Sequence, residues 1–183
     1  MIYVVRHGQT DWNLQGRCQG WQDIELNQTG LEQAKALAEK LKDVKFDVCF
    51  ASPLKRAVKT AQTIYDGEII LDRRIIERGN GDLEGRSDWK KLGVNFNDPN
   101  DANGKKYRIE MLPDLQKRLS SFWDEVLAKY AGKNVLVVTH AGTAMWSQVY
   151  FCGRPENGDM YLYHLANCEV WQIDNSRPLK VGY

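Results

Sequence analysis

Apolar residues gather along this chain in short runs and, between those runs, at helical spacing. The runs are rich in β-branched and aromatic residues, which favour the pleated and buried surface of a β-strand. Two segments near the end alternate apolar and polar residues at a period of two, which predicts a closing hairpin or two edge strands. The predicted strands are residues 2–5, 46–51, 69–71 and 135–139, followed by the alternating segments 161–165 and 169–173.

Between the strands, apolar residues recur every three or four positions, which predicts amphipathic helices. The first helix has its cap at Asn27 or Thr29, because either side chain can accept a hydrogen bond from a helix N-terminus. The second has Ser52 as its N-cap and Pro53 at the first helical position. The predicted helices are residues 31–41, 53–64, 115–130 and 143–151, and residues 78–113 are predicted to be loop with some short helix.

Strands separated by helices are typical of α/β folds, so the chain is predicted to form a mostly parallel sheet with helices on both faces, a three-layer sandwich. Ligands of such sheets bind at the carboxyl ends of the strands. Arg6 and His7 follow the first strand there, and His140 follows the strand at 135–139. If these strands are neighbours, the two histidines lie side by side. A helix N-terminus just after His140 would then offer free N–H groups that suit a phosphate.

Composition narrows the class of partner. The 183 residues include 25 Lys and Arg against 24 Asp and Glu, so no overall field favours nucleic acid or a membrane surface. There is neither a long apolar stretch that predicts a membrane span nor an N-terminal secretion signal. The four cysteines share no CxxC spacing, which indicates free thiols in a reducing compartment, and we expect a cytoplasmic protein. The length fits a single domain over residues 1–183.

Two more charged residues fall at the same edge of the predicted sheet. Arg56 lies in the first turn of the helix after the second strand, and Glu77 follows the third strand. Arginine donates to phosphate oxygens in a fixed fork. A neutral imidazole is a nucleophile near neutral pH, and a carboxyl group can protonate a leaving oxygen and later deprotonate water. His7 or His140 alone would fit a structural histidine equally well, but the combination with two arginines and a glutamate favours a phosphate site. No HxxxH-like spacing predicts a metal site.

Four short motifs occur in a fixed order along the chain. They are Arg6-His7-Gly8, Gly20-Trp21-Gln22-Asp23, Ser52-Pro53-Leu54-Lys55-Arg56-Ala57 and Thr139-His140-Ala141-Gly142, with Glu77, Gly81, Glu84 and Gly85 at ExxxGxxEG spacing before the last. In this order they resemble the histidine phosphatase superfamily, which includes cofactor-dependent phosphoglycerate mutases and many phosphatases. Ala141 stands where that family usually has glycine. The resemblance implies a phosphoglycerate mutase-like fold, with residues 78–113 as an insertion that covers the substrate.

The resemblance also implies a role for each site residue. His7 is the nucleophile that takes up the phosphoryl group, and Glu77 is the general acid and then the general base. The residues implied to hold the phosphate or the rest of the substrate are Arg6, Asn13, Gln19, Gly20, Arg56 and His140, of which Arg6, Arg56 and His140 count as catalytic as well. Neither a metal nor another cofactor is implied, because arginines and histidines neutralise the phosphate charge.

Three functions are compatible with these residues. The first is a phosphatase acting on a small phosphorylated metabolite, favoured by the short chain and by the form Gly81-Asp82-Leu83-Glu84-Gly85. The second is a phosphoglycerate mutase, although mutases usually have a larger insertion after the acid motif. The third is a non-catalytic phosphate-binding or interaction module, which would be expected to lack His7 or Glu77. Residues 86–112 carry aromatic and basic groups that either contact the substrate or form a solvated loop. The Gly-Glu-Ser motif of many relatives is not found before the following helix.

Overall fold

The computed structural model describes residues 1–175, which form a five-stranded sheet in the order β3-β2-β4-β1-β5. Neighbouring strands are parallel except for β5, which runs antiparallel to β1. The predicted mostly parallel sheet is therefore confirmed. The strands are β1 (Ile2–Arg6), β2 (Val48–Ala51), β3 (Ile69–Leu71), β4 (Val135–Thr139) and β5 (Val170–Ile173).

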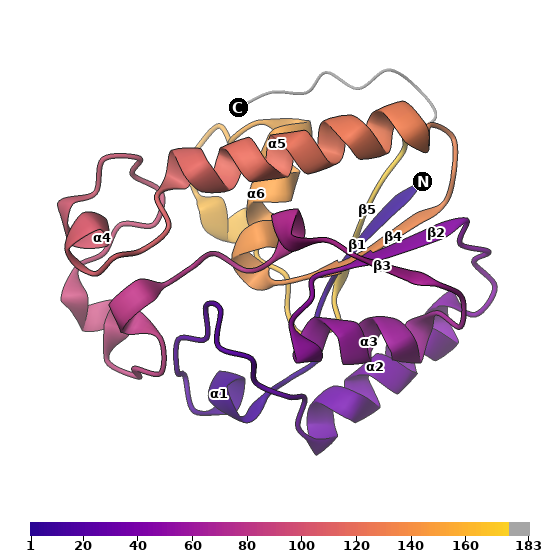
Figure 1. Ribbon diagram of the computed structural model, residues 1–183, viewed down its shortest axis with the longest axis horizontal. Helices are drawn as coiled ribbons and strands as arrows, with labels where there is room; N and C mark the ends of the chain where they lie inside the picture. Colours follow the sequence, from indigo (N-terminus) through magenta and orange to yellow (C-terminus); the bar gives the residue numbers. More distant parts are fainter. Residues whose placement is uncertain (176–183) are drawn as a thin grey trace.

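Helices cover both faces of the sheet, as Figure 1 shows, with one pair below it and the other pair above it. The lower pair is α2 (Gln28–Leu41) and α3 (Lys55–Ile64), and the upper pair is α5 (Leu112–Lys129) and α6 (Ala141–Cys152). This arrangement confirms the three-layer α/β sandwich. Within residues 1–175, no helix combines the length and the apolar character needed to cross a bilayer.

The residues of β1 alternate between two apolar cores. Ile2 and Val4 pack in the core that includes α5 and α6, whereas Tyr3 and Val5 pack in the core that includes α2 and α3. Successive side chains of a strand point to opposite faces, so a strand covered on both sides must be apolar throughout. This requirement explains why the first strand is an unbroken apolar run.

The segments that project from the carboxyl edge of the sheet are irregular. They contain the short helices α1 (Asp11–Leu14) and α4 (Ala102–Lys106), which lie at the same end of the molecule in Figure 1. A third apolar cluster joins Cys18, in the loop after β1, to Leu83 and Ile109. The prediction of loop with short helices over residues 78–113 is confirmed, since 3-10 helices at Gly81–Leu83 and Trp89–Leu92 accompany α4.

The predicted strand at residues 161–165 is wrong. Residues Met160–Tyr163 form a 3-10 helix, whose first turn is capped by the Asp159 side chain accepting a hydrogen bond from the backbone N–H of Tyr161. Tyr161 and Leu162 are both largely exposed, so the alternation of polar and apolar residues there does not correspond to alternate burial. The free edge of β1 is instead covered by β5.

The predicted start of the second helix is also wrong. Leu54 rather than Ser52 is the N-cap of α3, and it makes no side-chain capping bond. The backbone N–H of Lys55 donates instead to the carboxylate of Asp23 at 2.7 Å, which satisfies one of the unpaired groups of the helix end. Ser52 is therefore free to contact His140, and Arg56 keeps its predicted place in the first turn.

Candidate active site

The carboxyl ends of β1 and β4 bring the two histidines together. These strands pair in parallel with Arg6 opposite Thr139, so His7 and His140 follow at the same edge. The centroids of the two imidazole rings lie 5.1 Å apart. Arg56, from the first turn of α3, reaches the same place and donates a hydrogen bond to His140. The prediction that these segments meet is confirmed.

His7 is buried in the tautomer that a nucleophile requires. Its Nδ1 lies 2.7 Å from the carbonyl oxygen of Gly8. A carbonyl oxygen only accepts hydrogen bonds, so Nδ1 carries the proton and Nε2 keeps its lone pair. Burial, followed by the positive charges of Arg56 and Arg6, holds the pKa of His7 well below its usual value. The ring is therefore neutral at pH 7, with Nε2 available to attack an electrophile.

His140 is fully buried, and both of its ring nitrogens have partners. Nδ1 accepts a hydrogen bond from Nε of Arg56 at 3.2 Å, and Nε2 donates to Oγ of Ser52 at 2.7 Å. Burial, and then the charge of Arg56, lowers the pKa of His140 well below its usual value, which agrees with a neutral ring protonated on Nε2. His140 thus supports Arg56, and its implied contact with the phosphate stays a prediction.

A polar cavity of about 220 Å³, called here the inner pocket, opens beside His7. The Arg6 guanidinium donates from Nη1 to the carbonyl oxygen of Leu165 at 2.7 Å, whereas its Nε is buried without a hydrogen-bond partner among the described atoms. Because Arg6 lines this cavity as a cation with N–H groups to spare, its guanidinium favours a ligand with acceptor oxygens. The predicted site residues that line the inner pocket are Arg6, His7, Asn13, Gln19, Gly20, Arg56 and Glu77.

Arg56 holds the loop that forms one wall of the inner pocket. Its side chain is fully buried, and Nη1 and Nη2 donate to the carbonyl oxygens of Gln22 and Gly20 at 2.6 and 2.8 Å. Burial lowers the pKa of Arg56 to about 10, so the group remains a cation at pH 7. These bonds leave further N–H groups of the guanidinium for an anion.

Glu84 holds the same loop from the other side. Its Oε1 accepts hydrogen bonds from the backbone N–H groups of Trp21 at 2.9 Å and Asn80 at 3.0 Å, and its Oε2 accepts from the Gln22 side chain at 2.9 Å. Gly20 has a φ of +52°, and a Cβ at this position would collide with the Glu84 carboxylate. The motif spacing singled out Glu84 without a role, and the structure shows that it links this loop to the segment that follows Glu77.

The side chain of Glu77 contacts the N-terminus of α6. Its carboxylate accepts hydrogen bonds from the backbone N–H groups of Arg78 at 2.9 Å, Thr143 at 3.2 Å and Gly142 at 3.3 Å. The expectation that this helix offers free N–H groups to a phosphate is therefore wrong for Gly142 and Thr143, because Glu77 takes them. These contacts orient the carboxyl group of Glu77 at the wall of the inner pocket.

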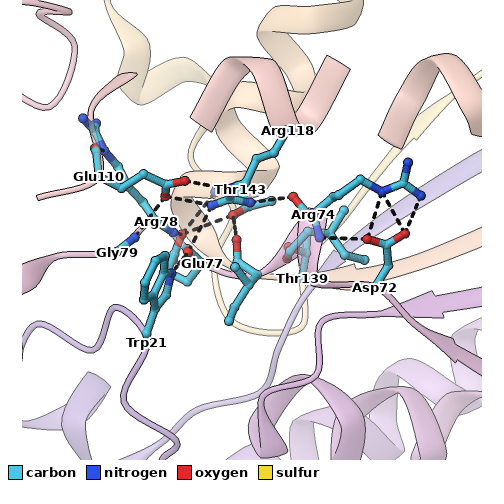
Figure 2. A network of polar contacts seen from close by, with 12 residues as sticks. Trp21, Asp72, Arg74, Glu77, Arg78, Gly79, Glu110, Arg118, Thr139 and Thr143 are labelled. Carbon is cyan, nitrogen blue, oxygen red and sulfur yellow. Dashed lines mark hydrogen bonds and ion pairs between the residues drawn. The ribbon is translucent and has the colours of Figure 1, made fainter. Parts of the chain in front are cut away.

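Arg118 of α5 holds the backbone around Glu77 (Figure 2). Its Nη2 donates to the carbonyl oxygen of Glu77 at 3.1 Å, and Nη1 donates to that of Arg74 at 2.5 Å. Its Nε donates to the nearly buried carboxylate of Glu110 at 2.7 Å. The indole N–H of Trp21 donates to the same Glu77 carbonyl at 2.6 Å. Arg118 and Glu110 belong to no recognisable sequence motif, and only packing brings them to Glu77.

Cys18 also lines the inner pocket but is not a competing nucleophile. Burial raises the pKa of its thiol to about 12, so the sulfur is protonated at pH 7 and unreactive.

The positive charge of the inner pocket is supplied by Arg6, Arg17 and Arg56, which all line the cavity. Over residues 1–175, three or more His, Cys, Asp or Glu side chains nowhere form a group that could hold a metal ion.

A comparison with known families decides the classification. Residues 2–178 match the model of the histidine phosphatase superfamily, branch 1. The chain belongs to this superfamily. The two histidine motifs, the Arg56 helix and the Glu77 segment that carried the resemblance are those that meet at the inner pocket.

Relatives of this histidine phosphatase superfamily member include phosphatases and mutases. It is 38% identical over 148 residues to the uncharacterized phosphatase PhoE of Bacillus subtilis, covering 76% of this chain and 70% of that protein. It is 44% identical over 163 residues to a 2,3-bisphosphoglycerate-dependent phosphoglycerate mutase of Rhizobium meliloti, covering 78% and 74%. A phosphoserine phosphatase variant of Entamoeba histolytica, crystallised with phosphoserine, is similar in fold with a TM-score of 0.78 and 28% identity, covering 92% and 87%.

Proposed function

We propose that this protein is a phosphatase that hydrolyses a small phosphomonoester through a phosphohistidine at His7, without a metal. The observation that carries the proposal is a neutral, buried His7 whose Nε2 is free beside a pocket lined by Arg6 and Arg56. A phosphate dianion needs charge-assisted donors of this kind, and a nucleophilic imidazole needs the lone pair. The phosphatases among the relatives support the same reaction class.

The reaction runs in two steps. In the first, Nε2 of His7 forms a bond to phosphorus while the ester P–O bond breaks, and the leaving oxygen takes a proton from Glu77. Arg6 and Arg56 stabilise the charge on the non-bridging oxygens during the in-line transfer. In the second, Glu77 takes a proton from water, whose oxygen attacks phosphorus. The P–N bond breaks, which regenerates His7 and releases inorganic phosphate.

The other residues predicted to bind the substrate have groups that fit a phosphate ester in the inner pocket. Oδ1 of Asn13 accepts hydrogen bonds from the backbone N–H of Thr10 at 3.1 Å and from Nδ2 of Asn167 at 3.3 Å, so its own Nδ2 is the group that can donate to the substrate. Gln19 and Gly20 belong to the loop held by Arg56, and His140 keeps Arg56 in place. We propose that residues 78–113 are an insertion that covers the substrate, since Trp89 and Phe96 line the inner pocket.

The Glu77→Gln variant tests the mechanism. An alkyl ester has a poor leaving group and needs a proton from Glu77, whereas nitrophenolate leaves without one. The variant should therefore lose far more rate on alkyl phosphates than on 4-nitrophenyl phosphate. With the nitrophenyl ester it should transfer phosphate quickly and hydrolyse the intermediate slowly. We expect a burst of nitrophenol and an acid-labile, base-stable phosphate on His7.

The His7→Ala variant is the matched control and should trap no phosphate under any condition. Equal impairment of Glu77→Gln on both esters, with neither burst nor phosphohistidine, would contradict the acid and base roles. Transfer of the trapped phosphate to 3-phosphoglycerate rather than to water would assign the mutase reaction instead. Binding of phosphate esters without turnover would assign the non-catalytic module.

A further inference from the structure

A larger cavity of about 570 Å³, called here the outer pocket, adjoins the inner pocket. The two cavities share Glu77, Asn80, Trp89 and Phe96 in their walls, so Glu77 stands at the boundary between them. In the proposed reaction the leaving oxygen takes its proton from Glu77. The alcohol part of the ester must then extend past Glu77 into the outer pocket. The inference below rests on the proposed function in this respect.

Aromatic side chains and methionines form much of the wall of the outer pocket. The rings of Tyr161 and His164 stack in parallel, with centroids 5.0 Å apart and planes 5° apart. Trp89 and Phe96 meet edge to face at 5.9 Å. Tyr161 is 76% exposed, so its ring remains available at the rim. Flat apolar faces of this kind bind the rings of a ligand by stacking or by edge contacts. A volume of this size accommodates a ligand much larger than glycerate or serine.

The charges in the outer pocket disfavour a carboxylated ligand. Arg78 is the guanidinium among the lining residues, and its Nε and Nη1 already donate to backbone carbonyl oxygens at 2.7 and 2.5 Å. Burial lowers the pKa of His164 below its usual value, so its ring is neutral at pH 7. Glu77 and Asp159 also line the cavity and would repel a carboxylate. The two carboxylates outnumber the single guanidinium in this wall, so a carboxylated alcohol loses its hydration here against a lining of net negative charge.

Two amide oxygens of the outer pocket lack a partner. Oδ1 of Asn80 and Oδ1 of Asn97 are buried and accept no hydrogen bond from the described atoms. A buried acceptor left unpaired is costly, so a ligand N–H or O–H at either oxygen is favourable. The cavity thus combines aromatic walls with neutral acceptors.

We propose that the outer pocket selects phosphate esters of uncharged alcohols that carry an aromatic or heteroaromatic ring with an N–H or O–H donor. The ring contacts Tyr161, Trp89 and Phe96, and the donor pairs with Asn80 or Asn97. Carboxylated esters such as phosphoserine, with which the relative from Entamoeba histolytica was crystallised, are poor substrates of this chain.

Three primary-alcohol phosphates test the selectivity: 2-(indol-3-yl)ethyl phosphate, 2-(naphthyl)ethyl phosphate and phosphoserine. Because all three leaving groups are primary alcohols, each needs a proton from Glu77. Phosphate release should give a kcat/KM for the indolyl ester about 10-fold or more above that for phosphoserine, the scale of two aromatic contacts. The naphthyl ester, which lacks a donor, should fall between them.

Two exposed neighbours provide the variant and its matched control. Tyr161→Ala should lower kcat/KM for the indolyl ester about 2- to 10-fold more than kcat/KM for phosphoserine, the loss of one aromatic contact. Leu162→Ala removes a side chain that is also exposed and lies on the same 3-10 helix but outside the cavity lining, so neither ester should respond. A kcat/KM for phosphoserine equal to or above that of the indolyl ester, or a Tyr161→Ala variant that affects both esters equally, would overturn the inference.

Acetyl phosphate separates failure of this inference from failure of the proposed function, because it is small and activated. If acetyl phosphate is hydrolysed in a His7-dependent manner but the indolyl ester has no advantage over phosphoserine, the proposed phosphatase function is supported and the proposed selectivity is overturned. If no ester is hydrolysed, calorimetric binding of 2-(indol-3-yl)ethylphosphonate decides. Tighter binding than that of the phosphonate analogue of phosphoserine would support the outer pocket assignment, and equal or weaker binding would overturn it.

Discussion

Burial of single side chains sets the protonation states on which the proposed chemistry depends. His7 and His140 lose nearly all contact with solvent beside Arg56, and this desolvation lowers the pKa of both imidazoles. Burial also lowers the pKa of Arg56, but only to about 10, so the guanidinium keeps its charge at pH 7. A neutral nucleophile and a permanent cation can therefore share one small cavity.

The first prediction concerns the pH at which His7 takes a proton. NMR of the ring nitrogens should show that His7 stays neutral, with a proton on Nδ1 alone, as the pH falls through about 6.5, the usual histidine pKa. The second proton should bind to Nε2 only at lower pH. Removing a nearby cation in Arg6→Met or Arg56→Met should raise this pKa toward 6.5. The chain has three histidines, so single substitutions assign each signal. An unshifted pKa in both variants would contradict the electrostatic argument.

The same shift links pH to stability. The unfolded chain binds protons on His7 and His140 near pH 6.5, whereas the folded chain binds them only at lower pH. The free energy of unfolding is therefore unaffected by these two groups above about pH 6.5. It falls as the pH decreases from there toward the lowered pKa values of the folded protein.

At the scale of elements, helices α5 and α6 position Glu77. The N-terminus of α6 holds the Glu77 carboxylate through the backbone N–H groups of Gly142 and Thr143. From the opposite side, Arg118 of α5 holds the Glu77 carbonyl oxygen. Two helices thus fix the main chain and the side chain of one glutamate separately (Figure 2).

The Gly142→Ala variant should lose activity on alkyl phosphates while its thermal stability stays nearly the same. A Cβ on Gly142 would lie 2.9 Å from Oε1 of Glu77, so Gly142→Ala must displace the carboxylate. Thermal unfolding should change little, because the higher helix propensity of alanine, worth at most about 1 kcal/mol, opposes the loss of the Glu77 hydrogen bonds. Hydrolysis of alkyl phosphates should fall much more than that of 4-nitrophenyl phosphate, because the change acts through Glu77. Equal losses on the two esters would exclude this route.

The ion pair between Arg118 and Glu110 should matter far more than an exposed pair on the same helix. Arg118→Met leaves the carboxylate of Glu110, whose side chain is only 10% exposed, without its charged partner. The expected loss is about 3–5 kcal/mol in the free energy of unfolding, measured with urea. Lys129→Met, which removes an exposed partner of Glu125, is the control and should cost at most about 1 kcal/mol. Adding Glu110→Gln to Arg118→Met should recover part of the stability.

At the scale of the whole molecule, the topology collects the site from distant parts of the chain. The central strands β1 and β4 present the two histidines, and β2 leads through Ser52 to Arg56. Asn80, Trp89 and Phe96 of the segment 78–113 line both the inner and the outer pocket, which supports the proposal that this segment covers the substrate. In the proposed reaction the phosphate occupies the inner pocket, which is lined by arginines, and the alcohol occupies the outer pocket, which is rich in aromatic side chains.

Hydrolysis should persist in excess EDTA. In the proposed mechanism, the charge of the transferring phosphoryl group is met by Arg6 and Arg56, which line the inner pocket, and the nucleophile is a side chain rather than a metal-bound water. Phosphate release after exhaustive chelation should therefore equal that of the untreated protein. Abolition by EDTA, with recovery on addition of Mg²⁺ or Zn²⁺, would contradict the metal-free mechanism.

The sequence by itself determined the five strands of the sheet, the layers and the edge at which the candidate site lies. Apolar runs and helical spacing are local properties, and a strand buried on both faces has few alternatives. Parallel strands then bring Arg6, His7 and His140 to one edge whatever their neighbours are. Arg56 and Glu77 were placed at the same edge because each follows a strand, and their motifs agreed with that position.

Only the tertiary structure decided which groups hold these residues in place. The hydrogen bonds from Arg118 to Glu77, from His140 to Ser52 and from the helix α6 to Glu77 join residues that are 41 to 88 positions apart. Such pairs follow from packing and leave no period in the sequence. For the same reason the alternating residues 161–165 are not a strand: a strand requires a neighbour, β5 pairs with the free edge of β1, and Met160–Tyr163 form a 3-10 helix.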